Sequence, residues 1–444
     1  MMWIELGILL ACILLGARLG GIALGTVAGI GLAIFVFAFA MPPGGPPGSV
    51  LGMIIAVITA LAAMQAAGGL DYLVLIADRL MRKHARYITF VAPVVTYVLV
   101  LASGTTHVIY ALLPVIAEVS RKAGIRPERP ISISVIAGFQ GVLASPISAA
   151  TVAMVGLLAQ KSVTLPRLIS VILPSTFLGV LVGALSVAWR GKELKDDPVF
   201  QSRAATMATP TAERSRELQG RALANARGST FLFLASISLV VFIGIFPELR
   251  PAYPVLTDGG VDTDQIKMDL AIMIVMLANA GLTSILFKAS PEAMLKGSVM
   301  RSGVAAIISI LGVAWLGSSF FEGNRASMVS GISALVGGHP WAFGAGLFLL
   351  SSMLFSAAAT VAILVPVGIA VGLGPYLLVA FYPAANSVFF FPTYGTLLAA
   401  ISFDQTGSTK IGKLLLNHSF MLPGLVTVIT SVVIAFFLGS VLLQ

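Results

Sequence analysis

Serine, threonine, glycine and proline interrupt the long apolar stretches of this sequence at four places. The breaks begin at Ser103 and Ser145 in the first half of the chain, and at Ser356 and Pro392 in the second half. A helix that restarts after such a break exposes free backbone N–H groups and the positive end of its dipole. Helix ends of this kind bind anions without a formal positive charge. The four breaks therefore predict an anion site.

Hydroxyl groups at the breaks could complete the hydrogen bonding of a bound anion, and no Lys or Arg lies within the breaks. Any one of these hydroxyls could equally serve helix packing, which is a common role in membranes. Together, the four ends could hold a ligand with two carboxylates. The candidate binding residues are Ser103, Gly104, Thr105, Thr106, His107, Ser145, Pro146, Ser148, Ser356, Ala357, Thr360, Pro392, Thr393, Tyr394 and Thr396.

Few ionisable side chains accompany these breaks. His107 could donate to a carboxylate, carry a proton, or be an interior histidine satisfied by its neighbours. Arg18 reads as a loop charge or as a substrate-facing arginine, and Glu118 is expected near the cytoplasmic interface. We expect Asp404 to cap or pair locally, just past the last break. Embedded carboxylates are too scarce to favour a carboxylate-based proton pump, although backbone carbonyls alone can bind Na⁺.

Composition requires that these breaks lie within a membrane. The chain has 444 residues, of which 58% are hydrophobic and 10% are charged, whereas soluble domains are about 25% charged. Apolar runs long enough to cross about 30 Å of hydrocarbon recur throughout, and we expect about ten to twelve membrane segments. The net charge of +9 lies mainly in short loops, which indicates membrane topology rather than nucleic-acid binding. Cys12 is the only cysteine, so neither a disulfide nor a thiolate metal cluster is expected, and we expect no cofactor.

The apolar pattern divides the chain into residues 1–189, a charged linker at 190–229, and residues 230–444. Basic residues flank the segment at about 87–120 on both sides. Its two arms of about 16 and 12 apolar residues are short for a full crossing, which favours a re-entrant hairpin, although two short tilted spans remain an alternative. A broken crossing helix follows at about 131–160. Residues 71–86 predict either an interfacial helix or an ordinary loop.

The second half repeats this order, with a hairpin at about 341–373 and a broken helix at about 375–402. Because the second hairpin enters from the opposite side, we predict an inverted repeat, as in secondary transporters. An intramembrane enzyme would need a catalytic dyad, paired aspartates or a metal motif within the spans, and the sequence has none. A membrane sensor or assembly protein would not need inverted breaks, although a regulator could bind the linker.

Five sequence segments together resemble the Dcu family of anaerobic C4-dicarboxylate carriers, and its aspartate/fumarate members most closely. They are Gly16-Ala17-Arg18-Leu19-Gly20-Gly21, Met64-Gln65-Ala66-Ala67-Gly68-Gly69-Leu70-Asp71, Arg126-Pro127-Glu128-Arg129-Pro130, Ala144-Ser145-Pro146-Ile147-Ser148 and Asn417-His418-Ser419-Phe420. The resemblance implies exchange of fumarate, succinate, malate or aspartate across the bacterial inner membrane. It also implies an all-α scaffold and transport domain that move as an elevator, and analogy with the wider ion-transporter superfamily suggests a homodimer. Uptake of the same anions driven by Na⁺ or H⁺ is the alternative.

The sequence departs from the family pattern at three positions within the breaks. Thr106 replaces a glycine at the first hairpin tip, Ala357 replaces a glutamine at the second, and Gly395 replaces the proline that usually follows the tyrosine. These changes affect substrate preference rather than substrate class. From the basic loops we expect both chain termini to be periplasmic.

Overall fold

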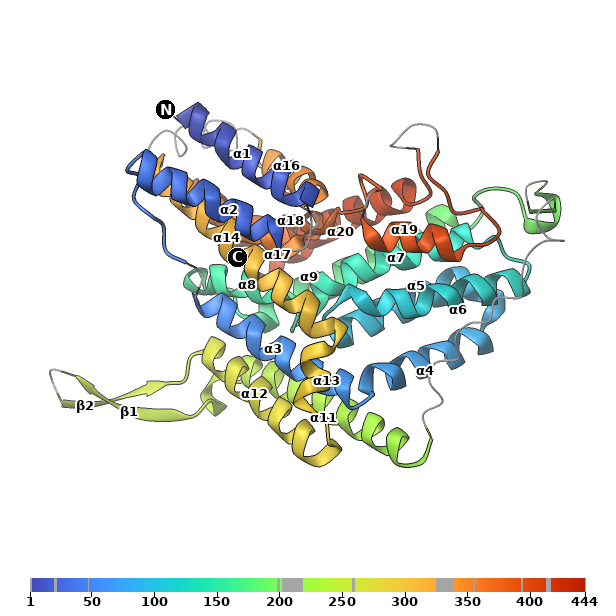
Figure 1. Cartoon of the computed structure of the whole chain (residues 1–444), viewed down its shortest axis with the longest axis horizontal. Helices are drawn as coiled ribbons and strands as arrows, with labels where there is room; N and C mark the ends of the chain where they lie inside the picture. The colour runs from blue at the N-terminus through green and yellow to red at the C-terminus, as the bar shows by residue number, and fades with distance from the viewer. Residues whose placement is uncertain are drawn as a thin grey trace.

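The computed structural model describes residues 2–19, 22–46, 48–197, 200–201, 219–257, 260–324, 339–354, 356–392, 394–412 and 417–443. Within these ranges the chain is mostly helical (Figure 1). Seven described helices are long and apolar enough to cross a membrane, or eight if the bent pair Leu51–Ala66 and Gly69–Lys83 forms one span. Four shorter apolar helices accompany them.

The chain begins with a series of helices. They are α1 (Met2–Leu19), α2 (Ala23–Ala33) with its π-helical extension η1 (Ile34–Ala38), α3 (Gly48–Ala66) and α4 (Gly69–Lys83). Of these helices, α1 packs on α2. The axis turns by 70° between α3 and α4. Of the two alternatives for residues 71–86, the structure has a helix, which ends at Lys83 with Arg82 and Lys83 in its last turn.

The second half opens with α11 (Gly220–Ile245), η6 (Pro247–Leu249), α12 (Met268–Phe287), α13 (Pro291–Lys296) and α14 (Ser298–Gly323). Helix α2 packs against α14, and α3 packs against α12. Glycine permits the first of these crossings, because a Cβ atom added at Gly25 would lie 2.0 Å from the carbonyl oxygen of Ile308. One added at Gly312 would lie 2.0 Å from the carbonyl oxygen of Gly25. Such small residues let membrane helices approach closely.

A β-hairpin between α11 and α12 departs from the all-α expectation. Strands β1 (Ala252–Thr257) and β2 (Gly260–Gln265) pair antiparallel and project from the helical body in Figure 1. The second strand could not be predicted from its composition, because it contains two aspartates and aspartate is depleted in strands. The available signal was Asp258-Gly259 between the strands, because Asp-Gly is a preferred two-residue hairpin turn.

The first predicted hairpin consists of η2 (Ala85–Tyr87), α5 (Ile88–Ser103), η3 (Thr106–Val108) and α6 (Ile109–Lys122). Arg82 before α5 pairs with Glu118 near the end of α6 at 3.1 Å, so both ends of the hairpin meet at its base. The predicted broken helix follows as α7 (Glu128–Ala144) and α8 (Ala149–Leu158), and the chain continues through η4 (Ala159–Lys161), α9 (Leu165–Val187) and η5 (Leu194–Asp196). Helix α7 is buried along almost its whole length, which puts its break in the interior.

The second hairpin and broken helix are α16 (Trp341–Leu354), α17 (Ala357–Ala370), α18 (Pro375–Phe381), η7 (Tyr382–Asn386) and α19 (Gly395–Phe403), followed by α20 (Met421–Leu442). Two boundaries differ from those read from the sequence. Helix α17 begins at Ala357 rather than after Thr360, because Ser356 caps it by accepting the Ala359 N–H. The second irregular stretch begins at Ser387 rather than at Pro392.

Tertiary contacts explain why an apolar run is not helical from Ser387 onward. The Ser387 N–H donates to Ser351 Oγ at 2.9 Å. The Phe389 ring packs edge-on against Phe348 and lies against Gly424, where a Cβ atom would be only 2.2 Å from the ring. Both Val388 and Phe389 are fully buried. Their apolar contacts therefore stabilise this segment although it is not helical.

Candidate functional site

The break between α7 and α8, at Ser145, is called the first break from here on, and the break between η7 and α19 is called the second break. The first break leaves one hydroxyl without a partner among the described residues. Ser148 caps α8, since its Oγ accepts the Thr151 N–H at 3.2 Å. Ser145 is fully buried, and its Oγ has no hydrogen-bond partner among the described residues. Leaving a buried hydroxyl unsatisfied costs about 1–3 kcal/mol. Ser145 is therefore available to a ligand at the start of α8.

The tip of the first hairpin reaches this break. Gly104 has φ +67, and a Cβ atom there would lie 2.9 Å from Ile147 Cγ1. This position therefore needs glycine both for its left-handed backbone and for the close approach. The Ser103 hydroxyl is buried and donates to the carbonyl oxygens of Val100 and Thr105, and these bonds hold the shape of the tip.

The second break meets the same place from the other half of the chain. Tyr394 caps α19 in an extended conformation without a side-chain cap, which leaves the first N–H groups of α19 open. Its ring packs edge-on against Phe139 of α7 with centroids 5.7 Å apart, and its hydroxyl is hydrogen-bonded with Thr106. Thr396 Oγ1 lies 3.5 Å from the Tyr110 hydroxyl. The first hairpin tip, the first break and the second break therefore converge.

The second hairpin tip is less closely joined to the first hairpin tip and to the two breaks. Thr360 Oγ1 donates to the Ser356 carbonyl oxygen at 2.8 Å, within the first turn of α17. Helix α17 itself packs along α8, which brings the second hairpin beside the helix that follows the first break. Thr393 and the side chains of His107 and Arg18 lie outside the described residues.

Sequence reasoning missed a set of polar residues where the two broken helices cross. Gln140 Nε2 donates to the Pro383 carbonyl oxygen at 3.2 Å, and Asn386 Nδ2 donates to the Phe139 carbonyl oxygen at 2.5 Å. The Tyr382 and Thr151 hydroxyls are 3.2 Å apart. An amide inside an apolar helix was the available signal, since polar side chains are rare and often functional there.

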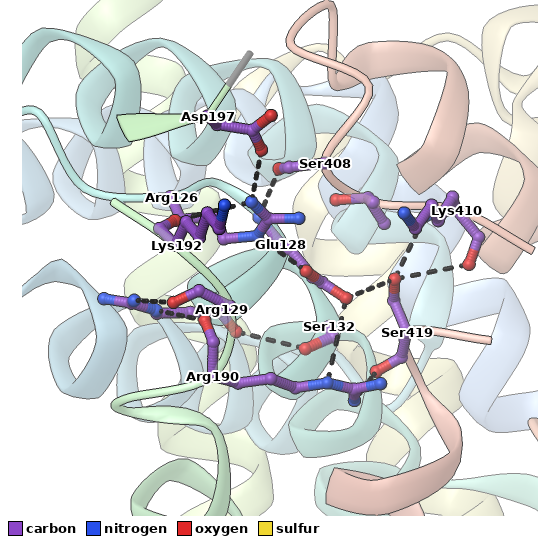
Figure 2. A network of polar contacts seen from close by, with 12 residues as sticks. Arg126, Glu128, Arg129, Ser132, Arg190, Lys192, Asp197, Ser408, Lys410 and Ser419 are labelled. Atoms are coloured by element: carbon purple, nitrogen blue, oxygen red, sulfur yellow. Dashed lines mark hydrogen bonds and ion pairs between the residues drawn. The ribbon is translucent and has the colours of Figure 1, made fainter. Parts of the chain in front are cut away.

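A network of charged side chains surrounds the start of α7, away from the breaks. Figure 2 shows Glu128, at the start of α7, between two segments distant in sequence. Its Oε2 accepts from Arg126 Nε at 2.8 Å, and its Oε1 accepts from Ser419 Oγ at 2.8 Å. Arg126 also pairs with Asp197 at 2.6 Å. Burial lowers the pKa of Arg126, but its bonds with Glu128 and Asp197 outweigh this and raise the pKa above its usual value.

This network explains two of the motifs that the sequence singled out. Arg126, Glu128 and Arg129 belong to one motif, and Ser419 belongs to the other. Arg129 pairs with Glu193 at 2.8 Å, so the start of the linker joins the network. Burial lowers the pKa of His418, whose neutral ring donates from Nε2 to the Phe390 carbonyl oxygen at 3.2 Å. These motifs connect the two halves of the chain, and His418 also holds the second irregular stretch at Phe390.

Asp404 has the local capping role expected for it. Its carboxylate accepts from the backbone N–H groups of Thr406 and Thr409 and from the hydroxyl of Ser408. Glu118 is mostly buried but pairs with both Arg82 and Lys122, as suits a residue at the hairpin base. The described residues contain no group of three or more His, Cys, Asp or Glu side chains that could hold a metal.

Broken helices that meet in the interior of a polytopic membrane protein are typical of secondary transporters. Residues 1–443 match the family described as anaerobic C4-dicarboxylate membrane transporter. The chain is 39% identical to the C4-dicarboxylate transporter DcuA of Wolinella succinogenes, with 100% of both chains covered. It is 37% identical to the anaerobic C4-dicarboxylate transporter DcuB of Escherichia coli, covering 97% of this chain and 96% of the relative. The chain therefore belongs to this family of C4-dicarboxylate transporters.

The family membership confirms the resemblance read from the five motifs. It also confirms a multi-pass membrane transporter rather than an enzyme, since the relatives are named as transporters. Among solved structures, the fold is similar to that of Neisseria gonorrhoeae MtrF, which is described as one of a class of antimetabolite efflux pumps. The TM-score is 0.60 at 15% identity, with 92% of this chain and 84% of that chain covered. That likeness concerns the fold alone.

Proposed function

We propose that this protein exchanges C4-dicarboxylates, including fumarate, succinate, malate and aspartate, across the bacterial inner membrane by alternating access. The observation that carries this proposal is the convergence of the break after α7 and the break before α19 with the tip of the first hairpin. The N-termini of α8 and α19 supply free N–H groups on separate helices, which suits a ligand with two carboxylates. Ser145 supplies a buried hydroxyl that no described protein group uses.

The binding residues that we propose are those of the four breaks. Ser145, Pro146 and Ser148 would bind at α8, and Pro392, Thr393, Tyr394 and Thr396 at α19. The first hairpin would contribute Ser103, Gly104, Thr105, Thr106 and His107, and the second Ser356, Ala357 and Thr360. Because no Lys or Arg lies in these segments, binding would depend on dipoles and hydroxyl groups, which permits release as well as capture.

Paired helix contacts support an inverted repeat. If α2 corresponds to α12 and α3 to α14, the packing of α2 on α14 has its counterpart in that of α3 on α12. Likewise α8 packs on α17, and α19 packs on α6. The contacts of α7 with α9 and of α18 with α20 form a third pair. Inversion of this kind is what lets one site face two sides in turn.

We further propose an elevator. The scaffold would comprise α1, α2, α3, α11, α12 and α14, and the carrier unit would comprise the hairpins, the broken helices, α9 and α20. Of the carrier helices, α17 packs on α14 and α8 packs on α3. In the described part of the chain, α6 and α19 make no contact of similar extent with these scaffold helices. Repeat symmetry predicts that α6 and α19 replace α17 and α8 there in the opposite state.

A disulfide between scaffold and carrier unit should therefore block transport. A Cβ atom at Gly317 of α14 would lie 3.8 Å from Cγ1 and from Cγ2 of Ile363 of α17, so the two side chains would be in contact there, as a disulfide requires. In a Cys12→Ser background, oxidised Gly317→Cys/Ile363→Cys protein should lose exchange and regain it on reduction. In the control pair Gly439→Cys/Tyr376→Cys, which lies within the carrier unit, the two Cβ positions are 3.8 Å apart, and this pair should exchange normally when oxidised. Full activity of the first pair when cross-linked would contradict the elevator.

Charge supports an orientation. The basic loop after α6, the segment after α9 and the loop after α19 lie at one end of the molecule, on the right in Figure 1, away from the β-hairpin. The positive-inside rule makes that end cytoplasmic. Both chain termini lie toward the other end, so we propose that they are periplasmic. In this orientation, the hairpin of α5 and α6 is re-entrant from the cytoplasm. We also propose a homodimer through the scaffold, and a regulator could bind the linker.

Counterflow in proteoliposomes tests exchange. Vesicles loaded with unlabelled fumarate or aspartate should accumulate labelled fumarate transiently, at a rate well above that of empty vesicles, without an ion gradient. Uptake that ignores internal dicarboxylate but follows an imposed Na⁺ or proton gradient would contradict exchange and favour the symport alternative.

A further inference from the structure

Three side-chain hydrogen bonds join the short helix η7 to both sides of the first break. Before the break, Gln140 donates to the Pro383 carbonyl oxygen and Asn386 donates to the Phe139 carbonyl oxygen. After the break, the Tyr382 hydroxyl meets Thr151. The second break starts directly after η7, at Ser387. We call this set of three bonds the crossing seam.

The crossing seam is buried, and the orientation of its two amide groups is fixed. Gln140 and Tyr382 are fully buried, and Asn386 is 5% exposed. A carbonyl oxygen can only accept a hydrogen bond, so both amide nitrogens must face the opposite broken helix. Gln140 Oε1 is therefore turned away, and it has no partner in the described ranges. The Gln140 side chain keeps its bond to Pro383 although its own oxygen has no partner among the described residues, which indicates that the bond across the two helices is important.

The two broken helices exchange these amide bonds reciprocally. An amide from α7 holds the backbone of η7, and an amide from η7 holds the backbone of α7. Such bonds between helices resist sliding along either axis. Tyr394, which precedes α19, packs on Phe139 of the same α7 segment, so the distance from the start of α8 to the start of α19 depends on how η7 lies on α7.

We propose that Gln140, Tyr382 and Asn386 are positioning residues that set the spacing of the two carboxylate sites and so select four-carbon dicarboxylates. This inference rests on the proposed function. A ligand with two carboxylates bridges the N-termini of α8 and α19 only if its length matches their separation. Loosening the crossing seam lets that separation vary, and the protein then discriminates less by chain length.

The test is the ratio of inhibition constants for unlabelled dicarboxylates against labelled fumarate counterflow. Wild-type protein should bind succinate more tightly than malonate or glutarate. In Gln140→Met and Asn386→Leu, which keep size but lose the donor, the glutarate-to-succinate ratio should fall about fivefold, the factor that corresponds to one buried hydrogen bond. A loss of folded protein alone lowers the maximum rate and leaves this ratio unchanged.

Thr230→Val provides a matched control. Thr230 Oγ1 makes a buried bond to the Gly69 carbonyl oxygen at 3.1 Å, between α11 and the start of α4. Its loss should leave the ratio at the wild-type value. Should neither amide variant fold, Tyr382→Phe decides alone, since Thr151 keeps its bond to the Leu143 carbonyl oxygen; its ratio should fall about twofold.

An unchanged ratio in folded Gln140→Met and Asn386→Leu would overturn the inference, as would an equal fall in Thr230→Val. If wild-type protein is inhibited by none of the dicarboxylates, the proposed function fails instead. If every variant discriminates between succinate and glutarate as well as wild-type protein does, the inference about the crossing seam is wrong but the proposed function stands.

Discussion

Replacement of Ser145 by alanine should raise the dicarboxylate concentration for half-maximal exchange by about tenfold or more. A hydrogen bond to a charged group contributes about 1.5–3 kcal/mol, which corresponds to roughly a tenfold to hundredfold loss of affinity. Folding should be unaffected, because Ser145 Oγ has no partner among the described residues. Proteoliposome kinetics and the thermal unfolding midpoint in detergent measure the two effects separately.

Ser148→Ala provides the comparison for stability. Ser148 Oγ accepts the Thr151 N–H and caps α8, so its loss should cost about 1 kcal/mol of stability. We thus expect Ser145→Ala to change affinity without stability and Ser148→Ala to lower stability. A Ser145→Ala protein with wild-type affinity would remove this hydroxyl from the binding site.

Replacement of Glu128 by glutamine should destabilise the fold by about 3 kcal/mol. Removing one partner of a buried ion pair leaves the other charge without compensation. Glu128 is 5% exposed and Arg126 is 7% exposed, and the Arg190 Nε lies 3.9 Å from Glu128 Oε1. Thermal unfolding in detergent should show a clear fall in the midpoint, because Arg126 would retain only Asp197 as an anionic partner.

Glu193→Gln tests whether the burial of Glu128 causes the destabilisation expected for Glu128→Gln. Glu193 also pairs with an arginine of the network, but its side chain is 45% exposed. An exposed carboxylate contributes less than about 1 kcal/mol to its pair, and Arg129 keeps its bonds to the carbonyl oxygens of Arg190 and Gly191. This variant should therefore unfold near the wild-type temperature. Equal destabilisation by both substitutions would mean that the charge of the network, rather than its burial, determines stability.

The sequence predicted the broken helices because their interruptions contain glycine, proline and polar residues. Ser145-Pro146 and Ser103-Gly104 break apolar runs with residues that end helices, and the structure breaks the helices there. The ends of the first hairpin were equally readable, because basic residues bracket it.

The features that escaped prediction depend on contacts between distant residues. Val388 and Phe389 would extend a helix by composition, but packing against α16 and α20 holds them in an irregular segment. The partners of Gln140 and Asn386 come from the opposite half of the chain, more than 240 residues away. No local pattern encodes such a pairing.

The roles of two motifs also emerged only from the structure. The segment from Arg126 to Pro130 and the segment from Asn417 to Phe420 marked the family without suggesting a purpose. Glu128 and Ser419 join them directly at 2.8 Å, and Ser408 accepts the Glu128 N–H at 3.0 Å. Residues of a family motif can therefore hold the two halves of the chain together.

A structure of the protein with bound succinate tests the proposed site most directly. We predict density for the ligand between the N-termini of α8 and α19, with one carboxylate within hydrogen-bond distance of Ser145 Oγ. Succinate bound elsewhere, with the breaks at Ser145 and Tyr394 unoccupied, would contradict the proposal that the breaks form the dicarboxylate site.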